Sequence, residues 1–206
     1  MKRQYPVRYS TLMRLVRSIH ANAARLFLDA CTLYRERAYP SAYALSILAY
    51  EELGKLEMVD HVGFEEMLSH GVRMTAERME HLFSRKMFYS HRNKQAWGSN
   101  RGREEQRIYA GALERDKQNA IYVGFVGGRI RQPTRYIASH AYKQLCYTLR
   151  AFEEIADIPF YGVHQQSTHA TRRHSQAVVN RLRKALARCP PPTAEIQNSL
   201  GRKKTQ

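Results

Sequence analysis

A chain of 206 residues with 43% hydrophobic and 25% charged residues suits one domain with a packed core, or one domain with an appendage. Its 34 Lys and Arg residues against 18 Asp and Glu residues give a net charge of +16, which favours RNA, the ribosome or an anionic membrane surface as partner. Three widely spaced cysteines without a CxxC motif argue against a disulfide framework and a zinc cluster. No apolar run reaches membrane-spanning length and no signal-peptide pattern is present, so we expect a cytoplasmic protein without a membrane span.

Helical periodicity dominates the first part of the chain. Apolar residues recur at i, i+3 and i+4 from Thr11 to about Arg37, which predicts one amphipathic helix. The helix is expected to end before Pro40, and Ser41 is expected to cap a second, strongly apolar helix from Ala42 to about His61.

The middle of the chain is less regular. A third helix is predicted from about Thr75 to Trp97, and the polar residues 98–107 are expected to form a loop. A shorter helix then leads into glycines with aromatic and β-branched residues, which predict a short irregular or β-hairpin insert near 119–134. After it comes an amphipathic helix from about Ile137 to Ile158, so the expected fold class is all-α, a helical bundle with one small insert.

The end of the chain is the most basic part. Residues 1–50 carry a net +6, residues 51–159 a net +2 and residues 160–206 a net +8. We expect residues 1–160 to form the helical domain, and 161–206 to form a basic helix from about Thr171 to Arg188 with a disordered tail. That helix is expected to lie on RNA, on an acidic protein or on a membrane surface, unless its apolar face simply docks on the bundle. Its candidate nucleic-acid ligands are Arg172, Arg173, Arg181, Arg183, Lys184 and Arg188.

A charged group interrupts the apolar second helix. At 100° per residue, Glu52 falls on the stripe that Leu45, Leu48, Leu56 and Val59 form, with Glu51 and Lys55 on its flank. A carboxylate among apolar residues needs a cationic partner. Lys94, a misfit on the apolar stripe of the third helix, is the expected partner, with His91 nearby. Such a pair suits either a reactive site or an ion pair that only fixes helix register.

The same residues carry a family resemblance. Residues 46–55 (Ser-Ile-Leu-Ala-Tyr-Glu-Glu-Leu-Gly-Lys) resemble the AbiV signature, an apolar run that ends in Glu-Glu-x-Gly-Lys. His91-Arg-Asn-Lys94 is similar to the family's His-x-x-Lys, and residues 113–123 are similar to its charged helix that leads to Tyr-Val. One departure is Gly124, where the family usually shows an acidic residue. The resemblance covers about residues 10–160 and implies an HEPN-like helical domain, a homodimer, and a role in defence against phage.

The resemblance also implies two kinds of action. Many HEPN proteins are metal-independent RNases with an Arg-x4–6-His motif, in which His handles the 2′-hydroxyl proton and Arg holds the phosphate charge. The chain offers Arg85-x5-His91, Arg14-x5-His20 and Arg135-x4-His140, which is as many matches as chance supplies with 25 Arg and 9 His. Only His91 also belongs to a family motif. The candidate catalytic residues are therefore His91, Arg85, Lys94, Glu52, Lys55 and Glu51, with no metal and no cofactor. The alternative is a non-catalytic module that binds RNA, the ribosome or a phage-encoded protein.

Overall fold

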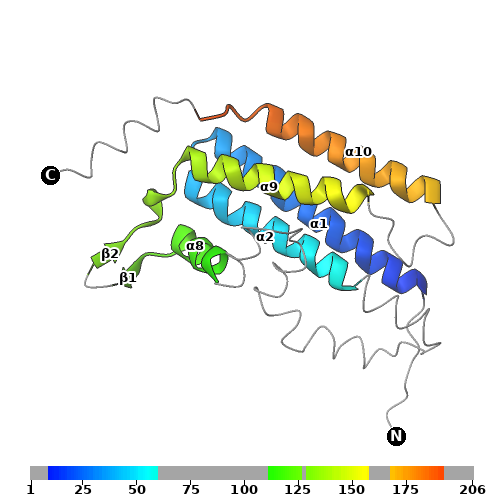
Figure 1. The fold of residues 1–206 in the computed structure, drawn as a ribbon, viewed down its shortest axis with the longest axis horizontal. Helices are drawn as coiled ribbons and strands as arrows, with labels where there is room; N and C mark the ends of the chain where they lie inside the picture. Colours follow the sequence, from blue (N-terminus) through cyan, green and yellow to red (C-terminus); the bar gives the residue numbers. More distant parts are fainter. Residues whose placement is uncertain (1–8, 60–110, 127–128, 158–167, 193–206) are drawn as a thin grey trace, which may run out of the picture.

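A computed structural model of the chain describes residues 9–59, 111–126, 129–157 and 168–192 (Figure 1). The helices in these ranges are α1 (Tyr9–Arg35), α2 (Tyr39–Met58), α8 (Ala112–Ile121), α9 (Ala138–Asp157) and α10 (Thr168–Ala187). The strands β1 (Gly124–Val126) and β2 (Arg129–Arg131) and the 3-10 turn η2 (Pro133–Arg135) stand between α8 and α9. The expected all-α bundle is confirmed. No helix in the described ranges is both long and apolar enough to cross a bilayer.

Four long helices lie side by side and form the bundle (Figure 1). In this view α1 and α10 run in one direction, and α2 and α9 run in the other. Helix α2 contacts α1, α9, α8 and η2, whereas α10 packs against α9 and α1. The amphipathic periodicity explains the outer helices, because one face of α1 (Leu12, Val16, Ala23 and Phe27) and one face of α10 (Val179, Leu182 and Leu186) enter the core. The expected boundary near residue 160 stays a prediction.

Helix α2 is the centre of the bundle and is buried on most of its circumference. Small residues such as Ala42, Ala49 and Gly54 let neighbouring helices approach it closely. The stripe that remains half-buried contains Leu45, Leu48, Glu52 and Lys55. The predicted buried stripe is therefore partly wrong: Leu56 and Val59 are buried, but Glu51 rather than Glu52 lies in the interior. Periodicity misplaces the buried side because a helix that is apolar nearly all round has no single apolar face.

The junction between α1 and α2 differs from the prediction in detail. Arg37 adopts a left-handed conformation with φ 62°, and the Ala38 N–H donates to the Leu33 carbonyl at 2.9 Å. This pair of features is a helix-terminating Schellman turn. Helix α2 then begins at Tyr39 with Pro40 in its first turn, so Ser41 is not its cap. Proline is tolerated there because the first N–H groups of a helix have no partner within the helix.

The predicted insert is a β-hairpin beside α8. Strand β1 pairs antiparallel with β2, with Phe125 opposite Ile130 and Val126 opposite Arg129. The two amphipathic helices predicted after the insert are α9 and α10, within three residues of the expected bounds. The helix predicted over residues 75–97, the loop predicted over 98–107 and the predicted disordered tail lie outside the described residues.

Candidate functional site

A buried ion pair joins α8 to α2. The Lys117 ammonium lies 2.6 Å from Glu51 Oε1 and 2.8 Å from Glu114 Oε2. The side chains of Lys117 and Glu51 are only 2% and 3% exposed, while that of Glu114 is 22% exposed. Burying an ammonium is strongly unfavourable unless carboxylates surround it, so the two acids keep Lys117 inside the protein. The cluster therefore fixes α8 against the central helix.

This ion pair unites two of the segments that carry the family resemblance. Glu51 belongs to the Glu-Glu-x-Gly-Lys motif, and Lys117, 66 residues further on, belongs to the charged helix that leads to Tyr-Val. This pair differs from the expected pair of Glu52 with Lys94, which stays a prediction. Lys94, His91 and Arg85 lie outside the described residues. The Glu51–Lys117 pair is almost sealed from solvent.

The other half of the charged motif lies nearer the surface. Lys55 Nζ donates to Glu52 Oε1 at 2.5 Å, one turn away on the same helix, and these side chains are 21% and 18% exposed. Glu52 and Lys55 thus form a partly accessible pair at the edge of the bundle. The two adjacent acids therefore lie in different places: Glu51 lies in the interior of the bundle, and Glu52 lies at its rim.

A tyrosine pair fastens the segment after the hairpin. Tyr136 Oη donates to Asp116 Oδ1 at 3.1 Å, and its ring stacks on Tyr43 of α2 with 4.8 Å between centroids. Burial, followed by the neighbouring Asp116 carboxylate, raises the pKa of Tyr136 to about 12. The hydroxyl therefore remains a proton donor, and the charged helix α8 is held on both sides by polar contacts.

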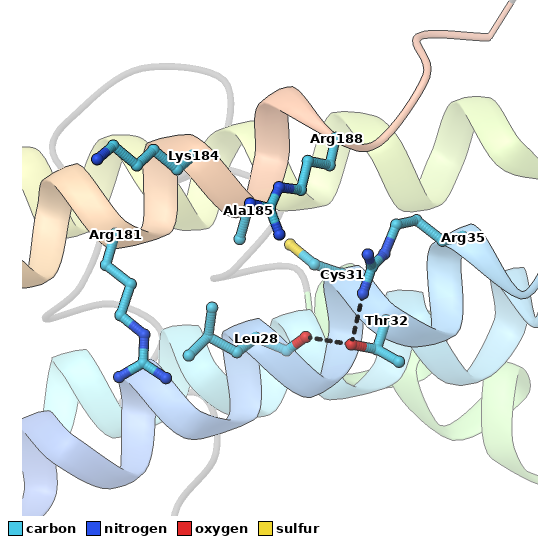
Figure 2. A pocket seen from close by; sticks show the side chains of 8 residues that line it. All are labelled: Leu28, Cys31, Thr32, Arg35, Arg181, Lys184, Ala185 and Arg188. Carbon is cyan, nitrogen blue, oxygen red and sulfur yellow. Dashed lines mark hydrogen bonds between the residues drawn. The ribbon is translucent and has the colours of Figure 1, made fainter.

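A basic groove runs between α1 and α10 (Figure 2). It has a volume of about 340 Å³ and is lined by Leu28, Cys31, Thr32 and Arg35 of α1, by Arg181, Lys184 and Ala185 of α10, and by Arg188 directly after α10. Both sets are spaced i, i+3, i+4, i+7, so each is one continuous stripe of a helix. Arg181 lies at one end beside Leu28, and Arg35 and Arg188 lie at the other end beside Cys31.

The cations of the basic groove are exposed and have no acidic partner in the part of the chain that the structure describes. Among the described residues, Arg35 donates only to the Thr32 hydroxyl, at 3.1 Å. Arg183, on the same helix, is different because it donates to Glu153 of α9 at 2.7 Å and so fastens α10 to the bundle. Like charges on two neighbouring helices produce a positive electrostatic potential along the groove.

The structure thus sorts the six predicted nucleic-acid ligands. Arg181, Lys184 and Arg188 line the groove, Arg183 forms the ion pair, and Arg173 is exposed elsewhere on α10. The side chain of Arg172 lies outside the described residues. Sequence reasoning missed Arg35, because nothing in α1 alone shows that α10 lies beside it.

Two of the three Arg-x-His matches fall on described residues. His20 is 7% exposed and packs edge-on against Phe152 with ring centroids 5.6 Å apart, whereas Arg14 is exposed. Burial, then the charge of His174, lowers the pKa of His20 from 6.5 to about 4, so this imidazole is neutral near pH 7. His140 is exposed and lies edge-on to Tyr136. A buried neutral imidazole with an outward-pointing arginine is a core residue.

The helical bundle, the β-hairpin beside α8 and the buried acid–base pair define an all-α, HEPN-like protein. The HEPN family model described as AbiV matches residues 11–152, well over half of the chain. The chain belongs to the AbiV family, and membership in this family of abortive-infection proteins indicates a role in defence against phage. No curated protein and no solved structure matches the chain. The matched range contains α1 but ends before α10, so the basic groove combines a helix inside it with a helix beyond it.

Proposed function

We propose that this AbiV protein acts in phage defence by binding RNA, free or within the ribosome, through the basic groove between α1 and α10. The observation that carries the proposal is that four exposed cations line one groove between α1 and α10, without an acidic partner in the described ranges. Guanidinium groups bind phosphate oxygens with two parallel hydrogen bonds. Contacts with the phosphates of the RNA backbone position the RNA and need no contacts with its bases.

The dimensions of the groove agree with this proposal. A stripe from i to i+7 extends about 10.5 Å along a helix, so the cations form a row rather than a single point. Balancing the partial negative charges at helix carboxyl ends requires cations only in the last turns. Arg181 lies before the last turn of α10, which ends at Ala187, so helix capping does not account for it.

A second candidate function rests on the family resemblance. His91 and Arg85 are proposed to cleave the bound RNA without a metal, with Lys94 beside them and Glu52 and Lys55 at the edge of the site. Glu51 would act only from the interior, because it is 3% exposed and pairs with Lys117. We further propose that the protein works in the cytoplasm as a homodimer, and that a phage-encoded protein is an alternative partner of its basic surface.

Fluorescence anisotropy with a labelled single-stranded RNA tests the binding proposal. The double variant Arg35→Gln/Arg181→Gln is expected to bind about tenfold more weakly or worse, because each lost contact is a charge-assisted hydrogen bond. Arg17→Gln/Arg129→Gln is the matched control, since it removes two exposed arginines that do not line the groove. Equal losses in both variants would show that only the overall charge matters.

Incubation of the RNA with purified protein in EDTA tests the cleavage proposal. Degradation by the unaltered chain that disappears in His91→Ala supports it. Degradation that persists in His91→Ala excludes His91 as the catalytic residue. If the unaltered chain binds RNA but does not degrade it, the protein is a non-catalytic RNA-binding module.

A further inference from the structure

Two cysteines that are 158 residues apart in the chain meet at one end of the basic groove. Cys31 lies on α1, and Cys189 lies two residues beyond the end of α10. Each residue is only 2% exposed. Cys189 Sγ donates to the Cys31 carbonyl oxygen at 3.6 Å and to the Ala185 carbonyl oxygen at 3.6 Å. Both are free cysteines.

The segment that carries Cys189 is held in place by contacts on both sides of it. Its own N–H donates to the Leu186 carbonyl at 2.8 Å, and Tyr34 Oη of α1 donates to the Pro190 carbonyl at 2.8 Å. The Cys189 thiol therefore lies against Cys31 at the junction between α1 and the segment after α10. Cys31 lines the groove, and its sulfur points toward Arg188 (Figure 2).

The two thiols have unequal environments. The hydrogen bond to Cys189, followed by burial, raises the pKa of Cys31 above its ordinary range. The hydrogen bond from Cys31 lowers the pKa of Cys189 against the effect of burial, and the Arg35 guanidinium lowers it further. Cys189 is thus the more acidic of the two thiols, and the more acidic thiol is the one that reacts first in thiol oxidation.

We propose that Cys31 and Cys189 are a reactive dithiol that a small peroxide closes to a disulfide, fixing the carboxyl end of α10 on α1. The Cys189 thiolate attacks one peroxide oxygen, the O–O bond breaks, and the other oxygen leaves as hydroxide and takes up the proton that Cys189 released. Cys31 Sγ then attacks the sulfenic sulfur of Cys189. The S–S bond forms, the S–O bond breaks, and the departing hydroxide takes the Cys31 proton. The two thiols lose two electrons and two protons, and hydrogen peroxide is reduced to two waters.

The cross-link acts on the basic groove, and this step rests on the proposed RNA binding. Arg188 directly precedes Cys189, and Arg35 lies one turn beyond Cys31. A disulfide links the two backbone segments that carry these arginines, so less backbone freedom is lost when an anion binds. The oxidised protein is therefore a tighter RNA binder than the reduced protein.

Peptide mapping of the full chain after treatment with hydrogen peroxide tests the dithiol. The free thiols are blocked with iodoacetamide before digestion, and the expected product is a Cys31–Cys189 linked peptide that dithiothreitol abolishes. Cys146, the exposed third cysteine, is the matched control. Cys146→Ser should leave the link intact, whereas Cys31→Ser and Cys189→Ser should abolish it. No link in the unaltered chain, or a link from Cys146 to either buried cysteine, overturns the proposal.

Phenylarsine oxide gives a second measurement that needs no oxidation, because a trivalent arsenical binds tightly only to two adjacent thiols. One equivalent per chain is expected for the unaltered protein and for Cys146→Ser, and none for Cys31→Ser or Cys189→Ser. Circular dichroism checks that each variant is folded. Absence of arsenical binding to the folded, unaltered chain argues against a paired dithiol.

RNA affinity of the reduced and oxidised forms separates this inference from the proposed function. We expect oxidation to tighten binding by about threefold to tenfold in the unaltered chain and not at all in Cys31→Ser. A disulfide that forms in a protein without RNA affinity would sink the proposed function and leave the dithiol standing. RNA binding by a protein that forms no Cys31–Cys189 link would overturn the dithiol and leave the proposed RNA binding standing.

Discussion

The Lys117 ammonium and the Glu51 carboxylate meet at 2.6 Å in the interior of the bundle, and Glu114 approaches the same ammonium at 2.8 Å. One base between two acids makes the three residues unequal in their importance to stability. Lys117 neutralises both carboxylates, whereas Glu51 shares its task with Glu114.

Lys117→Met is expected to lower the free energy of unfolding by about 3–5 kcal/mol, because it leaves two acids facing each other around a buried site. Glu51→Gln is expected to cost less, since Glu114 still neutralises the ammonium. Urea denaturation measures both changes. Lys55→Met, which breaks the more accessible pair with Glu52, is the control and should cost about 1 kcal/mol or less. Equal losses in all three variants would contradict the role assigned to burial.

The pH dependence of stability is expected to reveal His20. Its pKa of about 4 in the folded protein lies below the ordinary value of 6.5. Between these values the unfolded chain binds a proton that the folded chain refuses, so stability is full above pH 6.5 and falls as the pH drops toward 4. The contribution of His20 between pH 6.5 and pH 5 is about 2 kcal/mol.

Urea denaturation of the unaltered chain and of His20→Leu at pH 7 and pH 5 measures this contribution. Carboxylates also titrate at low pH, so the difference between the two proteins carries the information. His20→Leu should lose less stability than the unaltered chain on going to pH 5. His140→Gln, an exposed histidine, serves as the control and should behave as the unaltered chain does.

Arg37→Gly is expected to raise the stability by about 1 kcal/mol. Arg37 has a φ of 62°, a left-handed conformation that a side chain with a Cβ atom disfavours and glycine adopts readily. Thermal unfolding measures the change as a higher Tm. Arg37→Ala keeps the Cβ atom and therefore should not reproduce the gain, and an equal gain in both variants would trace the effect to the lost charge instead.

The sequence predicts the outer helices well and the contacts of the central one poorly. Strong amphipathic periodicity marks α1, α9 and α10, because each has a single apolar face that packs against the core. Helix α2 is apolar nearly all round, so a rotation of 100° between Glu51 and Glu52 decides which acid is buried, and periodicity cannot fix it. Lys117 stands in a run of charged residues (Glu-Arg-Asp-Lys) that looks like a solvated face, and only the position of α8 against α2 turns it inward.

The basic groove could not be predicted from the sequence, for a related reason. The cationic stripe of α10 is visible in its i, i+3, i+7 spacing, but the partner helix is not. Arg35 and Cys31 become part of the site only when α10 packs beside α1, and the chain between these helices is more than a hundred residues long. Long-range packing of this kind depends on the summed fit of many faces rather than on any local signal.

The two arginines Arg181 and Arg183 provide the sharpest separation of binding from architecture on one helix. Arg181 faces the groove, whereas Arg183 is paired with Glu153 at 2.7 Å across to α9. Arg181→Gln should leave the free energy of unfolding unchanged and reduce the slope of log affinity against log salt by about 0.7, the value of one phosphate contact on a single strand. Arg183→Gln should cost about 1 kcal/mol or less, because its ion pair is half-exposed, and should leave the salt slope unchanged. Anisotropy titrations at several salt concentrations, together with urea denaturation, measure both quantities. The two variants remove the same charge at positions two residues apart. An equal drop in the salt slope would therefore mean that RNA responds to the net charge of α10, and that the groove is not the binding site.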